Sequence, residues 1–205
     1  LFNKGKTTIL YYPNAKKGNY IIPASVEKIG AAVFKGKPEL TQITISKNIS
    51  EIGSEAFSEC LKLSVIIFEA GGTKPLIIGE EAFYDLPIKE IQLPERVTTI
   101  GKKAFNDCDY LTEFVIPEGV KEVGTDALNG CDRLRKVKIS STVETLGEYS
   151  PRIFLPFGGF SNCAALEEII VDENNKNFAS VDGILYGKKD GVISELYMAP
   201  RKKSG

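Results

Sequence analysis

The same phrase of about a dozen residues recurs six times along the chain, and this repetition limits the fold more than any other feature. An Ile-Gly pair, or an apolar equivalent, opens each phrase at spacings of 22 to 26 residues, and a large apolar residue closes it. Repetition at such a period is typical of a solenoid, in which each unit stacks on its neighbours. The pairs are Ile29/Gly30, Ile52/Gly53, Ile78/Gly79, Ile100/Gly101, Val123/Gly124 and Leu146/Gly147, and the closing residues are Phe34, Phe57, Phe83, Phe105, Leu128 and Phe160.

A second apolar pattern, L-x-x-I-x-I, follows each phrase. The alternation at its end is the period-2 signature of a short strand with one buried face, so we expect one short strand per repeat. The turns after three of these strands return Val97, Val120 and Val143 to the interior. The triplets are Leu40/Ile43/Ile45, Leu63/Ile66/Phe68, Ile88/Ile91/Leu93, Leu111/Phe114/Ile116, Leu134/Val137/Ile139 and Leu166/Ile169/Val171.

The Ile-Gly-x-x-Ala-Phe phrase has apolar positions at i, i+4 and i+5. This spacing is helix-like, and the Gly stands where the chain must bend sharply, so we interpret the phrase as a single helical turn. One repeat cannot fold alone, because roughly seven buried side chains at ~2 kcal/mol each do not offset ~1.5 kcal/mol for every residue that is ordered. Stacking of the repeats is therefore obligatory.

The full consensus, L-x-x-I-x-I-P-x-x-V-x-x-I-G-x-x-A-F-x-x-C, runs from about Tyr20 to Val171 and resembles the BspA-like class of leucine-rich repeat. The resemblance implies an α/β repeat solenoid, a right-handed leucine-rich-repeat superhelix with a parallel β-sheet on the concave face and short helical turns. It also implies an extracellular or cell-surface location and a non-enzymatic binding role.

The two ends of the chain depart from the repeat and are similar to each other. The segment LFNKGKTTILYYP at 1–13 lines up with LYGKKDGVISELYMAP at 185–200, where a Lys-Lys-Asp-Gly turn between apolar runs predicts a β-hairpin. The chain is thus expected to be a fragment of a longer array. We expect three parts: 1–19, a partial β-hairpin module ending a preceding unit; 20–172, a solenoid of about six repeats; and 173–205, a C-terminal β-hairpin module.

Composition argues against several classes of function. The 26 basic and 27 acidic residues leave a net charge of -1, so we expect no nucleic-acid partner. The longest apolar run, VIIF at 65–68, is far short of a membrane span, so we expect no membrane insertion by this part of the protein. The chain has no His, the commonest general base and zinc ligand, so we expect no enzyme, metal or cofactor.

The four cysteines occupy one position of the repeat, three residues after the closing residue of a phrase. They are Cys60, Cys108, Cys131 and Cys163, and Leu86 takes the same place in the third repeat. Because Leu takes this position in another repeat, we interpret the four cysteines as small buried hydrophobic side chains. A Cys108–Cys131 disulfide between adjacent repeats remains an alternative.

Side chains that point outward from the predicted strands form the expected partner-binding surface on the concave face. Several are apolar, which favours a protein or glycan partner, such as a host or matrix surface, over a purely solvated face. Strand propensity alone is the alternative explanation. The positions are Gln42, Thr44, Val65, Ile67, Glu90, Gln92, Glu113, Val115, Lys136, Lys138, Glu168 and Ile170.

An insertion of about nine residues at 147–160 is unusually apolar for a loop. We expect it to cover the convex side, with Tyr149, Phe154 and Phe157 as a recognition loop in the alternative interpretation. Together these features predict a non-enzymatic cell-surface or secreted leucine-rich-repeat module that mediates protein-protein or adhesive interactions. The competing hypothesis is a structural spacer, or stalk segment, with no binding site of its own.

Overall fold

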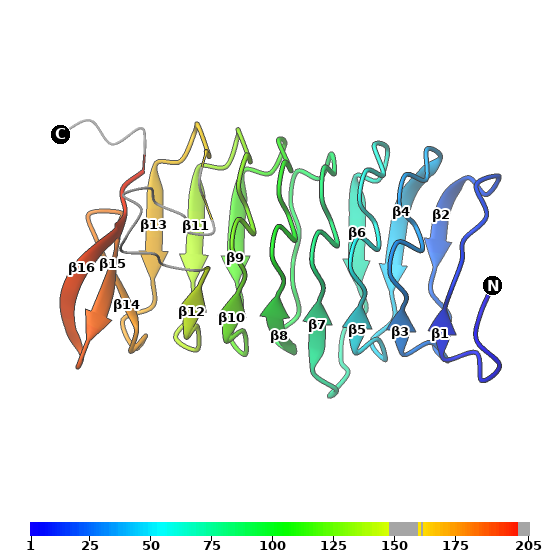
Figure 1. The fold of residues 1–205 in the computed structure, drawn as a ribbon, viewed down its shortest axis with the longest axis horizontal. Helices are drawn as coiled ribbons and strands as arrows, with labels where there is room; N and C mark the ends of the chain where they lie inside the picture. The colour runs from blue at the N-terminus through cyan, green and yellow to red at the C-terminus, as the bar shows by residue number, and fades with distance from the viewer. Residues whose placement is uncertain (148–159, 161, 201–205) are drawn as a thin grey trace.

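The computed structural model describes residues 1–147, 160 and 162–200, and within this part every regular element is a β-strand. The turns of chain follow one another along a nearly straight axis (Figure 1). The strands are β1 (Thr8–Ile9), β2 (Gly18–Ile21), β3 (Lys28–Ile29), β4 (Leu40–Ile45), β5 (Glu51–Ile52), β6 (Val65–Phe68), β7 (Leu76–Ile78), β8 (Val97–Ile100), β9 (Glu113–Ile116), β10 (Glu122–Val123), β11 (Lys136–Ile139), β12 (Thr145–Leu146), β13 (Glu168–Val171), β14 (Phe178–Val181), β15 (Ile184–Lys189) and β16 (Val192–Met198).

Most repeats contribute one strand to each of two parallel sheets on opposite sides of the solenoid. The continuous sheet has seven strands in the order β1-β3-β5-β7-β8-β10-β12 (Figure 1). The second sheet is split into β2-β4-β6 and β9-β11-β13, and residues 88–93 occupy the turn of the solenoid between its two halves without strand pairing. We call this second face the split sheet. The prediction of one strand per repeat was therefore wrong, because most repeats have two.

The Ile-Gly-x-x-Ala-Phe phrase does not form the helical turn that its spacing predicted, so the α/β class is corrected to an all-β solenoid. Ile52 ends a strand, and the following arc has left-handed backbone at Glu55 and Glu59, with φ of 55° and 59°. Backbone amides of this arc donate to the neighbouring repeat, as in Phe57 N to Ala82 O at 2.8 Å. Bonding between repeats thus replaces bonding within a helix, which the i, i+4, i+5 spacing alone could not reveal.

In five of the six phrases the Gly is required by close packing between repeats and not by a positive φ, whereas Gly147 in the sixth has φ of 69°. Gly101 has no positive φ, but a Cβ atom there would lie 2.6 Å from the carbonyl carbon of Gly79. Gly124 is tighter still, since its Cβ would lie 2.4 Å from the backbone nitrogen of Lys102. Only a residue without a side chain lets consecutive turns approach to hydrogen-bonding distance here.

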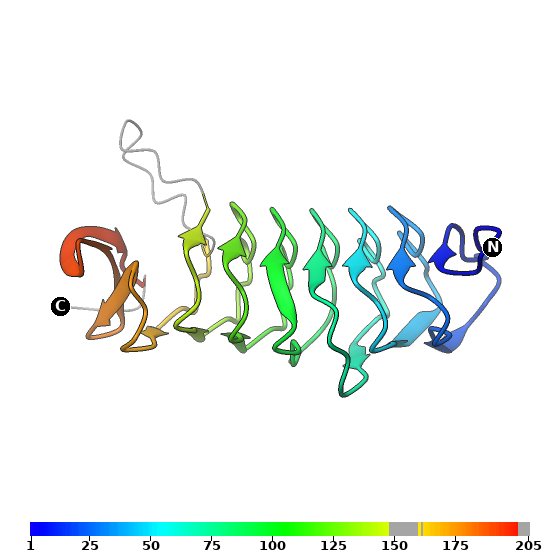
Figure 2. The same cartoon turned by 90° about the horizontal axis from the view of Figure 1, so that it is seen from below.

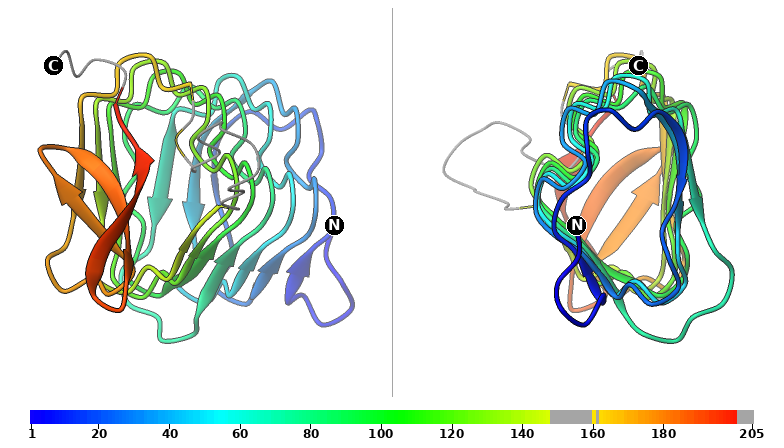
Figure 3. Two further views of the ribbon diagram at one scale, coloured as in Figure 1. Left: turned by 60° about the vertical axis from the view of Figure 1, so that its left-hand side comes forward. Right: turned by 90° about the vertical axis from the view of Figure 1, so that its right-hand side faces the viewer.

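The core lies between the two sheets, and the turns share one outline when viewed along the axis (Figure 3). The rings of the repeated Phe residues stack in a column whose centroids are 4.9 to 5.4 Å apart. The predicted interior positions Val97, Val120 and Val143 are fully buried, as expected. The members of the column are Phe34, Phe57, Phe83 and Phe105.

All four cysteines are buried free thiols, which confirms their interpretation as small core residues. Each also has a polar role, because its Sγ donates a hydrogen bond to a backbone carbonyl of the preceding repeat. Cys108 donates to Phe83 O at 3.2 Å, and Cys131 donates to Phe105 O at the same distance. Cys108 and Cys131 are both free, so the alternative of a disulfide between them is not realised. Burial raises the pKa of Cys108 to about 12, so this thiol stays protonated near neutral pH.

Hairpin segments lie at both ends of the solenoid (Figure 2). At the N-terminus Phe2 bridges Ile9 in antiparallel fashion. At the other end β14, β15 and β16 form an antiparallel sheet, and the hydroxyl of Tyr197 donates to Leu146 O in β12 at 2.8 Å. β15 and β16 pair as a hairpin on either side of the Lys-Lys-Asp-Gly turn, and this C-terminal sheet covers the last turn of the solenoid.

Candidate interaction surface

The outward side chains of the split sheet form two parallel rows, because strand pairing places equivalent residues of successive repeats side by side. Gln42 pairs with Val65 and Thr44 pairs with Ile67. On the other half, β9, β11 and β13 place Glu113, Lys136 and Glu168 in one row and Val115, Lys138 and Ile170 in the other. Glu90 and Gln92, in the unpaired segment between the halves, are exposed. The structure thus brings the twelve predicted residues onto one face.

One of the two rows has several apolar side chains in solvent, whereas the other has one, Val65, which is 42% exposed. Ile67 is 43% exposed and Val115 is 45% exposed, although each belongs to a strand whose inward residues are buried. Adjacent strands lie about 4.8 Å apart, so an apolar side chain recurs about every second strand. We call Ile21, Thr44, Ile67, Gln92, Val115, Lys138 and Ile170 the apolar row.

Ile21 is a surface residue that the sequence analysis missed. It pairs with Thr44 through β2 and is 66% exposed, more than Ile67 or Val115. The segment YIIPASVEKIG at 20–30 shows that a repeat strand begins here, because it has the apolar strand residues, the Pro turn and the Ile-Gly pair of a repeat. Extending the repeat by one strand toward the N-terminus would have placed Ile21 on the face.

Charged residues of the C-terminal half of the face neutralise one another. Lys138 Nζ lies 2.7 Å from Glu113, and Lys136 Nζ lies 2.8 Å from Glu168. The hydrogen bond from Lys138 lowers the pKa of Glu113, and the hydrogen bond to Glu168 raises the pKa of Lys136. Both pairs are exposed and screened by solvent, so neither adds much to the stability of the fold. Their main effect is to leave this part of the face without net charge.

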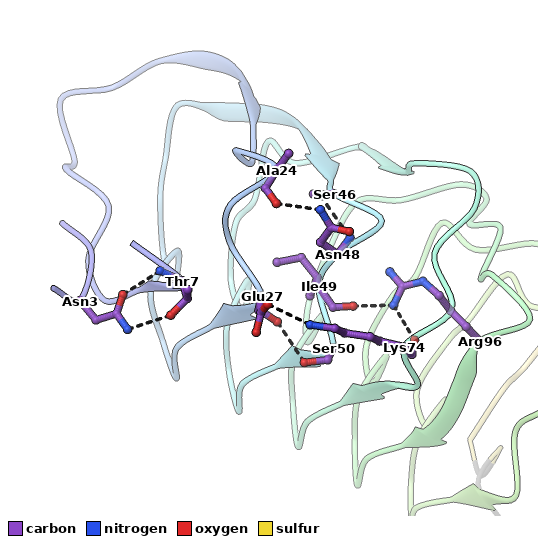
Figure 4. A network of polar contacts seen from close by, with 10 residues as sticks. All are labelled: Asn3, Thr7, Ala24, Glu27, Ser46, Asn48, Ile49, Ser50, Lys74 and Arg96. Carbon is purple, nitrogen blue, oxygen red and sulfur yellow. Dashed lines mark hydrogen bonds and ion pairs between the residues drawn. The ribbon is translucent and has the colours of Figure 1, made fainter. Parts of the chain in front are cut away.

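The longer turn after β6, residues 69–75, projects beyond the common outline and is held by polar contacts to earlier repeats (Figures 3 and 4). Lys74 Nζ lies 2.9 Å from Glu27, two repeats away. Arg96 donates from Nη1 to the carbonyl oxygens of Ile49 and Lys74, while its Nε and Nη2 are buried without a partner in the described part of the chain. These contacts fix the turn at one edge of the split sheet.

The structure does not test the alternative recognition loop, because Tyr149, Phe154 and Phe157 lie outside the described residues.

Reactive chemistry is sparse in the residues that the structure describes. No group of three or more His, Cys, Asp or Glu residues is placed to hold a metal ion within the described ranges. Asp85 and Asp109 lie near each other by a small hollow, and burial followed by neighbouring carboxylates raises the pKa of both. The described part of the chain contains no helix that is long and apolar enough to cross a membrane.

The fold and the exposed face define a leucine-rich-repeat solenoid, a fold that is generally a non-catalytic scaffold. Residues 10–75 and 76–181 match the BspA type leucine-rich repeat region in six copies. The chain therefore belongs to the BspA-type leucine-rich-repeat family, whose members are commonly surface-associated proteins with protein-interaction roles.

Solved structures agree with this assignment. The pneumococcal vaccine antigen PcpA superposes with a TM-score of 0.74 at 25% identity, over 90% of this chain and 47% of that one. A leucine-rich-repeat protein from Bacteroides ovatus gives 0.60 at 30% identity, over 80% of this chain and 41% of that one. A leucine-rich-repeat protein from T. pallidum, at 22% identity and a TM-score of 0.65 over 82% and 76%, shares the fold. The chain thus spans less than half of the first two proteins.

A comparison with curated protein sequences finds no match.

Proposed function

We propose that this chain is a non-enzymatic, protein-binding module of a cell-surface or secreted protein, and that its partner contacts the split sheet. The observation that carries the proposal is the apolar row, in which Ile21, Ile67 and Val115 each expose more than two fifths of their surface. Burying such side chains against a partner stabilises a complex by roughly 25 cal/mol for each Å² removed from water. The surface association of the family supports an extracellular location.

A protein fits this face better than a glycan. The outward positions of the split sheet have no aromatic ring on which a sugar could stack. They offer aliphatic side chains flanked by amides, hydroxyls and neutralised charges, and an apolar centre with a polar rim is the usual arrangement of a protein-protein interface.

The test is binding of the purified chain to immobilised matrix and host-surface proteins beside a glycan array. Wild type is compared with the double variant Ile67→Glu/Val115→Glu and with Ile77→Glu. Ile77 is a matched control because it is 46% exposed and lies on the continuous sheet. Saturable protein binding that the double variant loses and Ile77→Glu retains is the expected result.

Circular dichroism and thermal unfolding first establish that all three proteins fold alike. Binding that survives in the double variant would move the site off the split sheet. A folded wild type that binds none of the proteins would favour the spacer hypothesis.

A further inference from the structure

The split in the second sheet has a cause in the sequence of one repeat. Ile88 follows Phe83 by five positions, whereas Leu63 follows Phe57 by six, as in every other repeat. One missing residue draws the following segment back by about 3.3 Å relative to its neighbours. No backbone hydrogen bond joins β6 to residues 88–93 among the described residues, and a single long bond of 3.4 Å, from Thr112 N to Lys89 O, reaches the next repeat. Backbone donors and acceptors therefore remain free along this edge of β6.

A groove lies along this unpaired edge. Its volume is about 500 Å³, and its walls are residues 64–71 on one side and 90–94 on the other. Val65 and Ile67, which are 42% and 43% exposed, supply an apolar wall. The free backbone groups supply hydrogen-bonding positions between the two walls.

The groove also carries negative charge that the protein does not neutralise. Glu69 and Glu90 both line it, and neither has an ion-pair partner in the described part of the chain. The Glu69 carboxylate accepts a hydrogen bond from Lys47 N at 3.2 Å, and Glu90 is exposed. By contrast, Glu113 and Glu168 on the same face are paired with lysines. The groove is thus the acidic part of an otherwise neutral face.

We propose that this groove receives a basic side chain, preferably arginine, on an extended segment of the partner protein. The aliphatic stem lies on Val65 and Ile67, as long basic side chains do on apolar surfaces. The guanidinium group donates to the carboxylate of Glu90 and to free backbone carbonyls, since charge-assisted bonds to carboxylates are the strongest that arginine makes. The inference rests on the proposed function, because it assumes a protein partner on the split sheet.

The groove can be tested without knowing the partner. The probes are two blocked pentapeptides with valines on either side of the central residue, which is arginine in one and its neutral isostere citrulline in the other. Binding to the full chain is followed through the backbone amide resonances of residues 64–71 and 89–93. We expect the arginine peptide to shift these resonances, and the citrulline peptide to bind about fivefold more weakly, the upper end for an exposed ion pair.

Variants of the groove and a matched control complete the test. Glu90→Gln should weaken arginine-peptide binding about threefold to fivefold. Glu122→Gln makes the same charge change on the continuous sheet, where Glu122 is exposed in β10, and should leave binding unchanged. Equal binding of both peptides, no shift at the groove, or an unchanged affinity in Glu90→Gln would overturn the inference.

These outcomes are separable from the proposed function. A protein partner whose binding depends on Ile67 and Val115, but is indifferent to Glu90→Gln, would sustain the apolar row and reject the arginine site. Arginine-peptide binding in a chain that binds no protein would instead leave the groove real and the proposed function wrong.

Discussion

The ring of Phe83 lies parallel to the ring of Phe57, with the planes within 2° and the centroids 5.4 Å apart. Both side chains are fully buried, and each belongs to the same position of consecutive repeats. Offset stacking at this separation is a favoured geometry for aromatic pairs. Each of the repeats from Phe34 to Phe105 therefore adds one layer to a continuous aromatic column, and the loss of one layer affects the turns on both sides of it.

Shortening Phe83 tests the column. Phe83→Ala should lower the free energy of unfolding by about 3 to 5 kcal/mol, because it leaves a cavity between two rings. Phe83→Leu should cost about half as much, since Leu128 fills the equivalent position in a later repeat. Urea denaturation measures both, with Leu61→Ala as a control at a 64% exposed position of the same solenoid. An Ala variant as stable as the Leu variant would contradict this account.

A methyl group on Gly101 should force two turns apart. Its Cβ would lie 2.6 to 2.7 Å from backbone atoms of Gly79 and Glu80, which cannot rotate away. We expect Gly101→Ala to destabilise the chain by about 3 kcal/mol, at the upper end for overpacking. Gly5→Ala is the matched control, because its nearest neighbour would be 3.8 Å away. Thermal unfolding of the two variants side by side decides the point, and similar midpoints would refute it.

The buried thiols should be inert in the folded chain. Burial raises the pKa of Cys60 to about 11 and that of Cys108 to about 12, so neither presents a thiolate near neutral pH. We expect iodoacetamide at pH 8 to leave both unmodified until urea unfolds the protein, as read by mass spectrometry.

The same shifts give the sign of the alkaline response. A thiol whose folded pKa exceeds its unfolded pKa stabilises the fold below the unfolded value, and that contribution is lost as pH rises toward the folded one. Stability should therefore fall between about pH 9 and pH 12 through Cys108. Rapid alkylation of Cys108 in the native chain would show that its environment is more open than described.

Asp85 should destabilise the fold once it is ionised. Burial first, and then the charges of Asp107 and Glu59, raise its pKa. A carboxyl with a raised folded pKa favours folding at low pH and opposes it as pH rises through that value. Asp85→Asn should thus increase stability at pH 7 by a few tenths of a kcal/mol and have little effect near pH 3.5.

Asparagine is suitable here because it tolerates the left-handed backbone of Asp85, where φ is 53°. Asp190→Asn is the control, because Asp190 also has φ of 53° but lies in the exposed hairpin turn. It measures how an amide in place of a carboxylate changes stability through the backbone conformation alone. Urea titrations at the two pH values give the comparison. A gain for Asp85→Asn that is equal at both would point to the backbone and not to the charge.

The apolar periodicity was sufficient to predict the inward positions but not the local geometry between them. Leu111, Phe114 and Ile116 are buried as predicted, because their spacing follows directly from the pleat of a strand. The Ala-Phe arc was misread as helical, since a left-handed residue placed between apolar ones produces a similar spacing. Gly, Asp and Asn recur two residues after the closing residue, as at Asp85 and Asp107, and their tolerance of positive φ was the overlooked signal.

The sequence was sufficient to predict which residues of the candidate surface point outward, but not which of them form ion pairs. The alternation within each strand placed Ile67 and Val115 outside, and both are exposed. The ion pair of Lys138 with Glu113 depends on the register between repeats, which no single repeat specifies. The missing residue before Ile88 was visible in the sequence, but its effect on strand pairing required the neighbouring turns.

The hydrogen bonds between turns run along the long axis of the solenoid, so a pulling force applied to its two ends loads them directly. Bonds loaded in this way open one after another instead of shearing together, and the chain should lengthen turn by turn. The junction between β6 and residues 88–93 keeps its bonds in the continuous sheet and the arc but lacks those of the split sheet. Under tension the molecule would therefore part there first, at the groove where we place the partner's arginine.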